Sequence, residues 1–189
     1  MAAAAAIQRV YARHKARVGD DVRLGVPNRR STPSTRSARR LDEDTKAVRA
    51  VSFNYARTER TFFDDELKGH FDRLEGMGPD KAEVSLVSKT RDEATWVVSF
   101  RRDDGPTEYS LYDTASHKLT PLFVSQPALS DYKFAHMEDV RIQARDGLEL
   151  VAYLTRAKAD KPTPLVLCVH GGPWARDFWG FNSAAQWFA

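Results

Sequence analysis

The sequence predicts a mixed fold: a part built from antiparallel β-strands, followed by the first strands of an α/β domain. Two observations support this prediction. Between residues 46 and 135, short β-rich runs alternate with tight turns. After residue 136, a hairpin pattern leads into residues 165–169, which are apolar on both faces. A strand of that kind is typical of the centre of a covered sheet.

The composition is that of an ordinary globular chain, with 42% hydrophobic and 29% charged residues in 189. The single cysteine excludes an intrachain disulfide framework. No apolar run approaches the roughly 20 residues that cross a bilayer, so we expect no membrane partner. Residues 1–40 carry ten basic and two acidic side chains, and the remainder carries 19 and 24. Since the body is mildly acidic, the net charge does not indicate a nucleic-acid partner.

Residues 1–45 are expected to form a disordered, low-complexity basic arm, because they offer few large apolar side chains. The arm lacks the apolar core of a secretory signal. Its Ala-, Arg- and Ser-rich start is also compatible with an organellar transit peptide, a nucleic-acid-binding arm or a misread reading frame. Cytoplasmic localisation is the default expectation, with organellar targeting by residues 1–40 as the alternative.

The next part, residues 46–135, begins with strands expected at 48–55 and 61–63, on either side of a charged turn at 57–60. A helix is expected at 64–75, where apolar side chains recur at spacings of four and three. These side chains are Leu67, Phe71 and Leu74. We interpret the acidic run Asp64, Asp65 and Glu66 as the N-terminal charge cluster of this helix rather than as a catalytic pair, and we expect Asp64 or Asp65 to be its cap.

Four further strands separated by turn residues are predicted at 83–89, 95–101, 107–113 and 118–124. In the second of them, Trp96, Val98 and Phe100 share one face. Four antiparallel strands in roughly 42 residues match the size of one β-propeller blade. We therefore predict that 46–135 is the C-terminal portion of a β-propeller, with a plain antiparallel meander as the alternative.

The last part, residues 136–189, opens with alternating runs at 139–145 and 148–155 around Asp146-Gly147, which predicts a two-residue hairpin turn. The apolar run 165–169 leads directly into His170-Gly171-Gly172. In α/β hydrolases a loop of this type follows a central strand and supplies one N–H of the oxyanion hole. Residues 136–189 are accordingly predicted to be the start of an α/β-hydrolase domain.

These motifs carry a family resemblance. The series Asp146-Gly147-Leu148, His170-Gly171-Gly172-Pro173-Trp174-Ala175-Arg176-Asp177 and Trp179-Gly180 resembles the start of the hydrolase domain in the prolyl oligopeptidase family. It is most similar to the acylaminoacyl-peptidase/dipeptidyl-aminopeptidase-like branch. The runs at 84–88, 96–98, 109–113 and 119–123 are similar to late propeller sequence of the same family. The resemblance spans residues 48–189.

The resemblance implies a serine peptidase that cleaves short peptides, with a propeller restricting entry and a Ser–Asp–His triad performing acyl transfer. The positions that match are His170, Gly171 and Gly172, which make up the oxyanion-hole loop. The backbone N–H of Gly171 or Gly172 is the implied donor. In some branches a tyrosine stands at the position of His170. Arg176 and Asp177 match the motif but have no chemical role that the sequence defines.

The sequence also departs from the family pattern. In an α/β hydrolase the nucleophile, the acid and the histidine all follow the oxyanion loop. This sequence contains no G-x-S-x-G, and 180–184 lacks the second glycine. We therefore expect a truncated fragment that holds the oxyanion loop without the catalytic triad, and no peptidase activity from this chain alone.

Other chemistry is weakly indicated. The histidines, His14, His70, His117, His136 and His170, lack the spacing of metal ligands, and neither a metal nor a cofactor is predicted. Cys168 is two residues from His170, but we interpret it as a small buried core residue. The aromatic residues at 178, 179, 181, 187 and 188 are interpreted as core against a sheet, or else as the lining of a domain interface or substrate cavity.

Two alternatives to the peptidase interpretation remain open. One is a non-enzymatic, β-rich binding module in which the glycine loop is only a turn. The other is a fragment of an esterase-type α/β hydrolase. The partner that the peptidase interpretation implies is a short peptide substrate, and the sequence does not indicate an oligomeric state.

Overall fold

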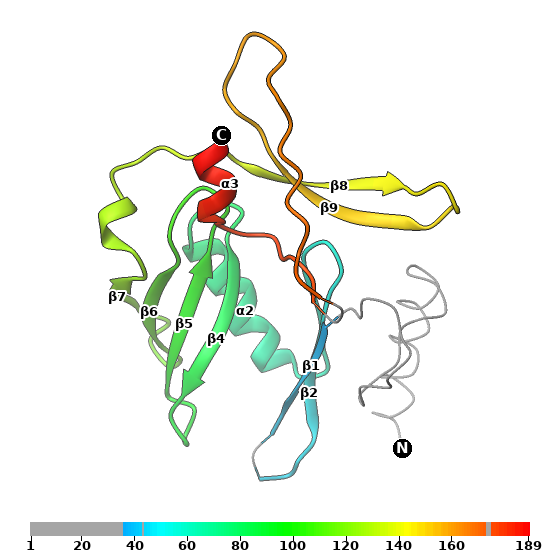
Figure 1. Ribbon diagram of the computed structural model, residues 1–189. Helices are drawn as coiled ribbons and strands as arrows, with labels where there is room; N and C mark the ends of the chain where they lie inside the picture. Colours follow the sequence, from blue (N-terminus) through cyan, green and yellow to red (C-terminus); the bar gives the residue numbers. More distant parts are fainter. Residues whose placement is uncertain (1–35, 43, 173–174) are drawn as a thin grey trace. The chain divides into compact units, whose positions relative to one another are not determined.

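The computed structural model describes residues 36–42, 44–172 and 175–189. The chain divides into two compact units. The first contains the described residues up to 68 together with 170–172 and 175–176, and the second contains Gly69–Val169 and Asp177–Ala189. Both are mostly antiparallel β-structure, which confirms the β-rich character predicted from the sequence (Figure 1). The predicted boundaries at 45 and 135 stay a prediction.

The first unit is built on a three-stranded antiparallel sheet in the order β1 (Arg36–Leu41), β2 (Val48–Asn54) and β3 (Thr58–Phe62). The prediction of disorder is wrong for Arg36–Leu41, because this polar strand pairs along β2. Residues 1–35 of the predicted arm lie outside the described residues. The charged turn expected at 57–60 is also shorter than predicted, since Thr58 already pairs with Asn54.

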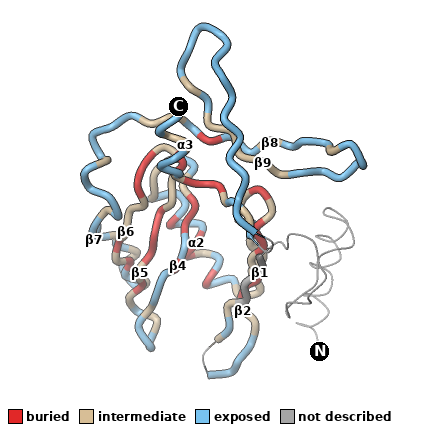
Figure 2. The backbone as a smooth tube through the Cα atoms, in the orientation of Figure 1, coloured by how far each residue is buried: buried red, intermediate tan, exposed pale blue. Residues whose placement is uncertain are grey.

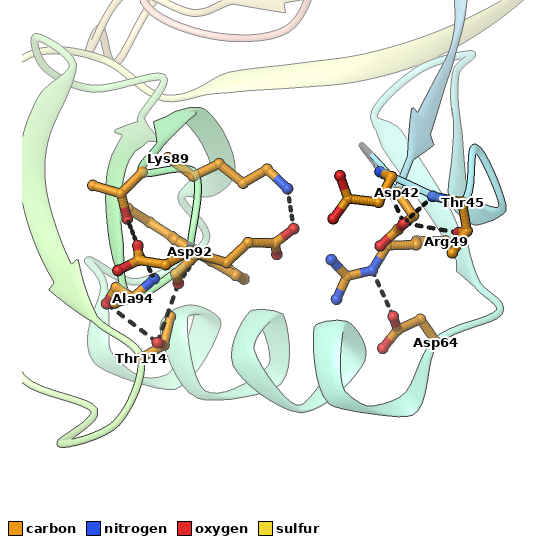
Figure 3. A network of polar contacts seen from close by, with 12 residues as sticks. Asp42, Thr45, Arg49, Asp64, Lys89, Asp92, Ala94 and Thr114 are labelled. Atoms are coloured by element: carbon orange, nitrogen blue, oxygen red, sulfur yellow. Dashed lines mark hydrogen bonds and ion pairs between the residues drawn. The ribbon is translucent and has the colours of Figure 1, made fainter.

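A buried face and a polar network hold this sheet. Val51 and Phe53 of β2 are buried. Arg49 Nε donates to Asp64 Oδ2 at 2.5 Å (Figure 3). Asp64 Oδ1 accepts from the Leu67 N–H at 2.8 Å. Asp64 therefore caps the helix that follows, as predicted.

That helix, α2 (Asp65–Met77), follows the predicted spacing: Leu67, Phe71 and Leu74 are all at most 2% exposed. It ends where the Gly78 N–H donates to Leu74 O. At Gly78 a Cβ atom would lie 2.4 Å from the Phe100 ring, so only glycine fits at this close approach.

The second unit contains a four-stranded antiparallel sheet in sequence order: β4 (Glu83–Lys89), β5 (Thr95–Arg101), β6 (Glu108–Asp113) and β7 (Leu119–Val124). All four predicted runs are confirmed as strands. Trp96, Val98 and Phe100 are at most 1% exposed and form the buried face of β5. Much of β5 is accordingly coloured as buried in Figure 2. The tight turns predicted between the strands allow this nearest-neighbour order.

A polar cluster lies within this core. The hydroxyl of Tyr112, a fully buried residue, lies 2.9 Å from His70 Nδ1 and 3.1 Å from His117 Nδ1. Because the hydroxyl has one proton, it can donate to only one of the two rings. Burial raises the pKa of the Tyr112 phenol.

The hairpin predicted in the last part is formed by β8 (Met137–Gln143) and β9 (Glu149–Thr155). Its turn differs from the predicted two-residue type. The Ala144 N–H donates to Leu148 O, and the Gly147 N–H donates to Ala144 O. The loop thus has three residues and ends on Gly147 at a φ of 84°, a conformation that glycine adopts readily.

The buried strand predicted at 165–169 is not formed. Leu165, Leu167 and Val169 are 78–82% exposed, and residues 165–169 belong to no strand. In the part of the chain that the structure describes, no strand pairs with this run, so its side chains have no sheet to pack against. The prediction of a buried Cys168 is wrong for the same reason, since this thiol is exposed.

Two short elements complete the described chain. They are the 3₁₀ turn η1 (Pro127–Leu129) and the helix α3 (Ser183–Phe188). The Asn182 side chain caps α3 by accepting from the Ala185 N–H at 3.0 Å. Among the described residues, no helix has the length and apolarity required to cross a membrane.

We predict that Val98→Ala lowers the free energy of unfolding by about 2 kcal/mol, because it leaves a cavity in the buried face of β5. Val87→Ala makes the same change on the same sheet, at a side chain 54% exposed, and should change it by less than about 0.5 kcal/mol. Urea unfolding followed by circular dichroism measures both. Equal effects would contradict the burial pattern.

Stability should also fall in acid. Burial acts to raise the pKa of Asp64, but its hydrogen bonds from the Leu67 N–H and Arg49 outweigh that effect and lower the pKa. A carboxyl with a lowered folded pKa stabilises the fold above its unfolded pKa of about 3.9, and this contribution is lost as pH falls through the folded pKa.

Asp64→Asn keeps a capping side chain but removes the charge. We expect the urea midpoint of this variant to fall less than that of the wild type between pH 5 and pH 3. Parallel losses in the two proteins would show that the Asp64 charge contributes nothing to the acid sensitivity.

Candidate functional site

The predicted oxyanion loop, His170, Gly171 and Gly172, is exposed and has no regular secondary structure. The His170 ring folds back on it, and Nδ1 donates to Gly171 O at 2.8 Å. The hydrogen lies on Nδ1 because a carbonyl oxygen can only accept. A Cβ atom at either glycine would meet no atom within 4 Å. The backbone here is therefore open to an approaching ligand.

The chain is fixed again just beyond this loop. Arg176 is half-buried, and its Nη1 donates to Asn54 O at 2.7 Å while Nη2 donates to Tyr55 O. These carbonyls lie at the turn between β2 and β3. The sequence motif contained Arg176 but did not define its role, and the structure supplies one: the guanidinium binds the end of a strand.

In the second unit, the turn after β5 is a centre of long-range hydrogen bonds that local sequence patterns did not reveal. Asp103, only 7% exposed, accepts from the Met137 N–H at 2.8 Å and from His136 Nδ1 at 3.2 Å, both through Oδ2. These bonds attach the start of β8 to the four-stranded sheet. A buried carboxylate requires such donors because it loses its hydration.

The segment around α3 joins the same turn. The Phe181 N–H donates to Arg102 O at 2.7 Å. Gln186 Nε2 donates to Asp103 O and to Ala135 O, and its Oε1 accepts from the Ala135 N–H. We call Arg102, Asp103, Ala135, Met137 and Gln186 the β5-turn hub.

The predicted aromatic cluster divides into two groups. Trp179 is buried, and its Nε1 donates to Met137 O at 3.0 Å, while Phe181 packs edge-on against Phe134 at 4.9 Å between ring centroids. Trp187 and Phe188 are 86% and 59% exposed. The interpretation as core is confirmed for Trp179 and is wrong for Trp187 and Phe188, because α3 turns these two side chains to solvent.

Among the described residues, three ligand-type side chains converge: Asp103, Asp104 and His136 have ligand atoms within 4.8 Å of one another. The Arg102 guanidinium, 2.8 Å from Asp104 Oδ1, lowers the pKa of that carboxyl. Two of the three groups thus already have strong partners, Asp103 in Met137 and Asp104 in Arg102. The arrangement fits a structural role at the turn after β5.

Comparison with known proteins identifies the relatives of the chain. It is 39% identical over 157 residues to dipeptidyl aminopeptidase BIII of Pseudoxanthomonas mexicana, a match that covers 78% of this chain and 22% of that protein. This similarity fits the prolyl oligopeptidase/dipeptidyl-peptidase-like family. Dipeptidyl peptidase family member 6 of Caenorhabditis elegans is 26% identical over 165 residues, covering 75% and 22%. No family model matches the chain, and no solved structure matches it significantly.

The resemblance inferred from the sequence is therefore confirmed at the level of the prolyl oligopeptidase/dipeptidyl-peptidase-like family. The chain spans 22% of the length of each of these two relatives. The peptidase activity of the whole protein is therefore proposed below rather than stated here.

The β5-turn hub makes a prediction about stability. Asp103→Ala leaves the Met137 N–H without its acceptor and should cost about 1–3 kcal/mol. Asp103→Asn retains an acceptor oxygen and should cost less. Urea unfolding gives the free energies, and hydrogen exchange at the Met137 amide reports the bond itself. The amide should exchange faster in Asp103→Ala than in Asp103→Asn, and the prediction fails if both variants match the wild type.

Proposed function

We propose that this chain is part of a serine-type peptidase that hydrolyses peptide bonds in short peptides by acyl transfer. The observation that carries the proposal is the 39% identity over 157 residues to a dipeptidyl aminopeptidase. The second relative is also a dipeptidyl peptidase by name. The partner proposed for the whole protein is accordingly a short peptide substrate.

We assign each part of the chain a place in such a peptidase. In the proposal, residues 46–135 belong to the end of a β-propeller and residues 136–189 open an α/β-hydrolase domain. The antiparallel order β4-β5-β6-β7 supports the first assignment, since a blade is a four-stranded sheet of this kind. The hairpin β8–β9, followed by the apolar run and the glycine loop, supports the second.

The proposed role of His170–Gly172 is to stabilise negative charge. When a nucleophile attacks a peptide carbonyl, the oxygen gains charge, and N–H donors about 3 Å away stabilise it. The Gly171 or Gly172 N–H is the donor in this proposal, and the open space around both glycines leaves room for a substrate. The nucleophile, acid and base are proposed to lie outside these 189 residues, because the sequence contains no G-x-S-x-G.

The proposal predicts that the 189-residue chain alone does not hydrolyse dipeptide chromogenic substrates. Loss of a catalytic nucleophile lowers kcat by on the order of 10⁶ in a serine protease. A chimera in which this chain replaces the matching segment of dipeptidyl aminopeptidase BIII should hydrolyse them. Turnover by the purified chain, or an inactive but folded chimera, would contradict the proposal.

Paired variants of the chimera test the donor itself. Gly171→Pro and Gly172→Pro each remove one N–H, and loss of the true donor should lower kcat about 10²–10³-fold. Gly171→Ala and Gly172→Ala keep the N–H and have room for the added methyl group. If neither proline variant loses at least tenfold more activity than its alanine control, neither amide is the donor.

A further inference from the structure

Arg176 joins an exposed stretch of chain to a folded sheet. Every residue from 158 to 172 is exposed. The contact between His170 and Gly171 lies within the loop and does not attach the loop to anything else. Arg176, half-buried, bonds to the carbonyls of Asn54 and Tyr55, more than 120 positions earlier in the sequence. Pro173 and Trp174, between the loop and Arg176, lie outside the described residues.

The chemistry of arginine fits this attachment. Its planar guanidinium presents N–H donors in a rigid fork, so two nitrogens can bond to two neighbouring oxygens at once. The oxygens here are consecutive backbone carbonyls at the end of β2. The position of these carbonyls is itself fixed, because β2 pairs antiparallel with both β1 and β3. The two bonds therefore define both the position and the orientation of the side chain.

We propose that Arg176 is a positioning residue: by bonding to the β2–β3 turn, it holds the end of the His170–Gly172 loop and restricts the Gly171 and Gly172 amides to one arrangement. The catalytic consequence rests on the proposed function. Donors in an oxyanion hole are effective when they are already in place before charge develops. An exposed loop that is rich in glycine does not hold such an arrangement by itself.

The test uses the full 189-residue chain, labelled with ¹³C and ¹⁵N, and needs no activity. Wild type, Arg176→Ala, Arg176→Lys and the control Arg156→Ala are compared by NMR. Arg156 is also an arginine, but its side chain is 67% exposed and pairs with Glu138 on β8. Unchanged amide signals of β5 in all four proteins show that the sheet of the second unit remains folded.

In Arg176→Ala we expect the carbonyl ¹³C shifts of Asn54 and Tyr55 to move, because both oxygens lose a donor. We also expect the order parameters of the Gly171 and Gly172 amides to fall toward the flexible range, below about 0.6. Arg176→Lys should give an intermediate result, because one ammonium cannot reproduce the fork. Arg156→Ala should match the wild type.

Two results would overturn the proposal. Unmoved Asn54 and Tyr55 carbonyl shifts would show that the bonds do not exist in solution. Moved carbonyl shifts with unchanged Gly171 and Gly172 amides would show that Arg176 stabilises β2 without positioning the loop.

The chimera separates this proposal from the proposed function. In an active chimera, Arg176→Ala should lower kcat on the order of 10–100-fold while KM is unchanged, because Arg176 positions donors and does not touch substrate. Arg176→Lys should recover part of the loss. A folded but inactive chimera would defeat the proposed function, while the amide order parameters would still decide the positioning role.

Discussion

The second unit depends most on the hydrogen bonds that the buried carboxylate of Asp103 accepts. Removed from water, this group needs hydrogen-bond donors, and it finds them in the Met137 N–H and in His136. The choice of donors decides where β8 begins relative to the sheet β4–β7. The backbone around Asp103 then takes up the last part of the chain, because Arg102 O binds the Phe181 N–H and Asp103 O binds Gln186. One turn thus orders segments that lie 33 to 83 residues downstream.

The same hydrogen bonds bear on the domain boundary that the family resemblance predicts. The position expected for a boundary between propeller and hydrolase, residue 135, falls inside the β5-turn hub, where Ala135 exchanges two hydrogen bonds with Gln186. The chain on either side is therefore held together at that point rather than joined by a loose linker. Beyond β9 the character changes, since residues 158–172 are exposed although 165–169 are strongly apolar.

Local patterns in the sequence predicted much of the fold. The strands at 83–89 and 95–101 were predicted with their observed bounds, because alternating apolar side chains and turn residues are both local signals. The cap at Asp64 and the hairpin around Gly147 followed from the same kind of reasoning.

The strand at Arg36–Leu41 was missed, since its polar composition gives no sign of the pairing with β2 that forms it. The prediction of a buried strand at 165–169 was wrong because hydrophobicity alone does not provide a neighbouring strand to pair with. Asp103 lies in the turn between two predicted strands, and its partners at Met137 and Gln186 are too distant in sequence for any spacing rule to identify them. Arg176 is part of a sequence motif, but its partners, the carbonyls of Asn54 and Tyr55, lie more than 120 residues earlier in the chain and no local pattern predicts them.

The central proposal is that the backbone amide of Gly171 or of Gly172 faces the reacting carbonyl oxygen of a peptide substrate. The most direct measurement is a crystal structure of the chimera with dipeptidyl aminopeptidase BIII, trapped with a dipeptide boronic acid that forms a tetrahedral adduct with the serine nucleophile. The account predicts a boronate oxygen about 3 Å from the backbone nitrogen of Gly171 or Gly172. An adduct whose oxygens are bound elsewhere, with both amides facing solvent or packed inside the protein, would contradict it.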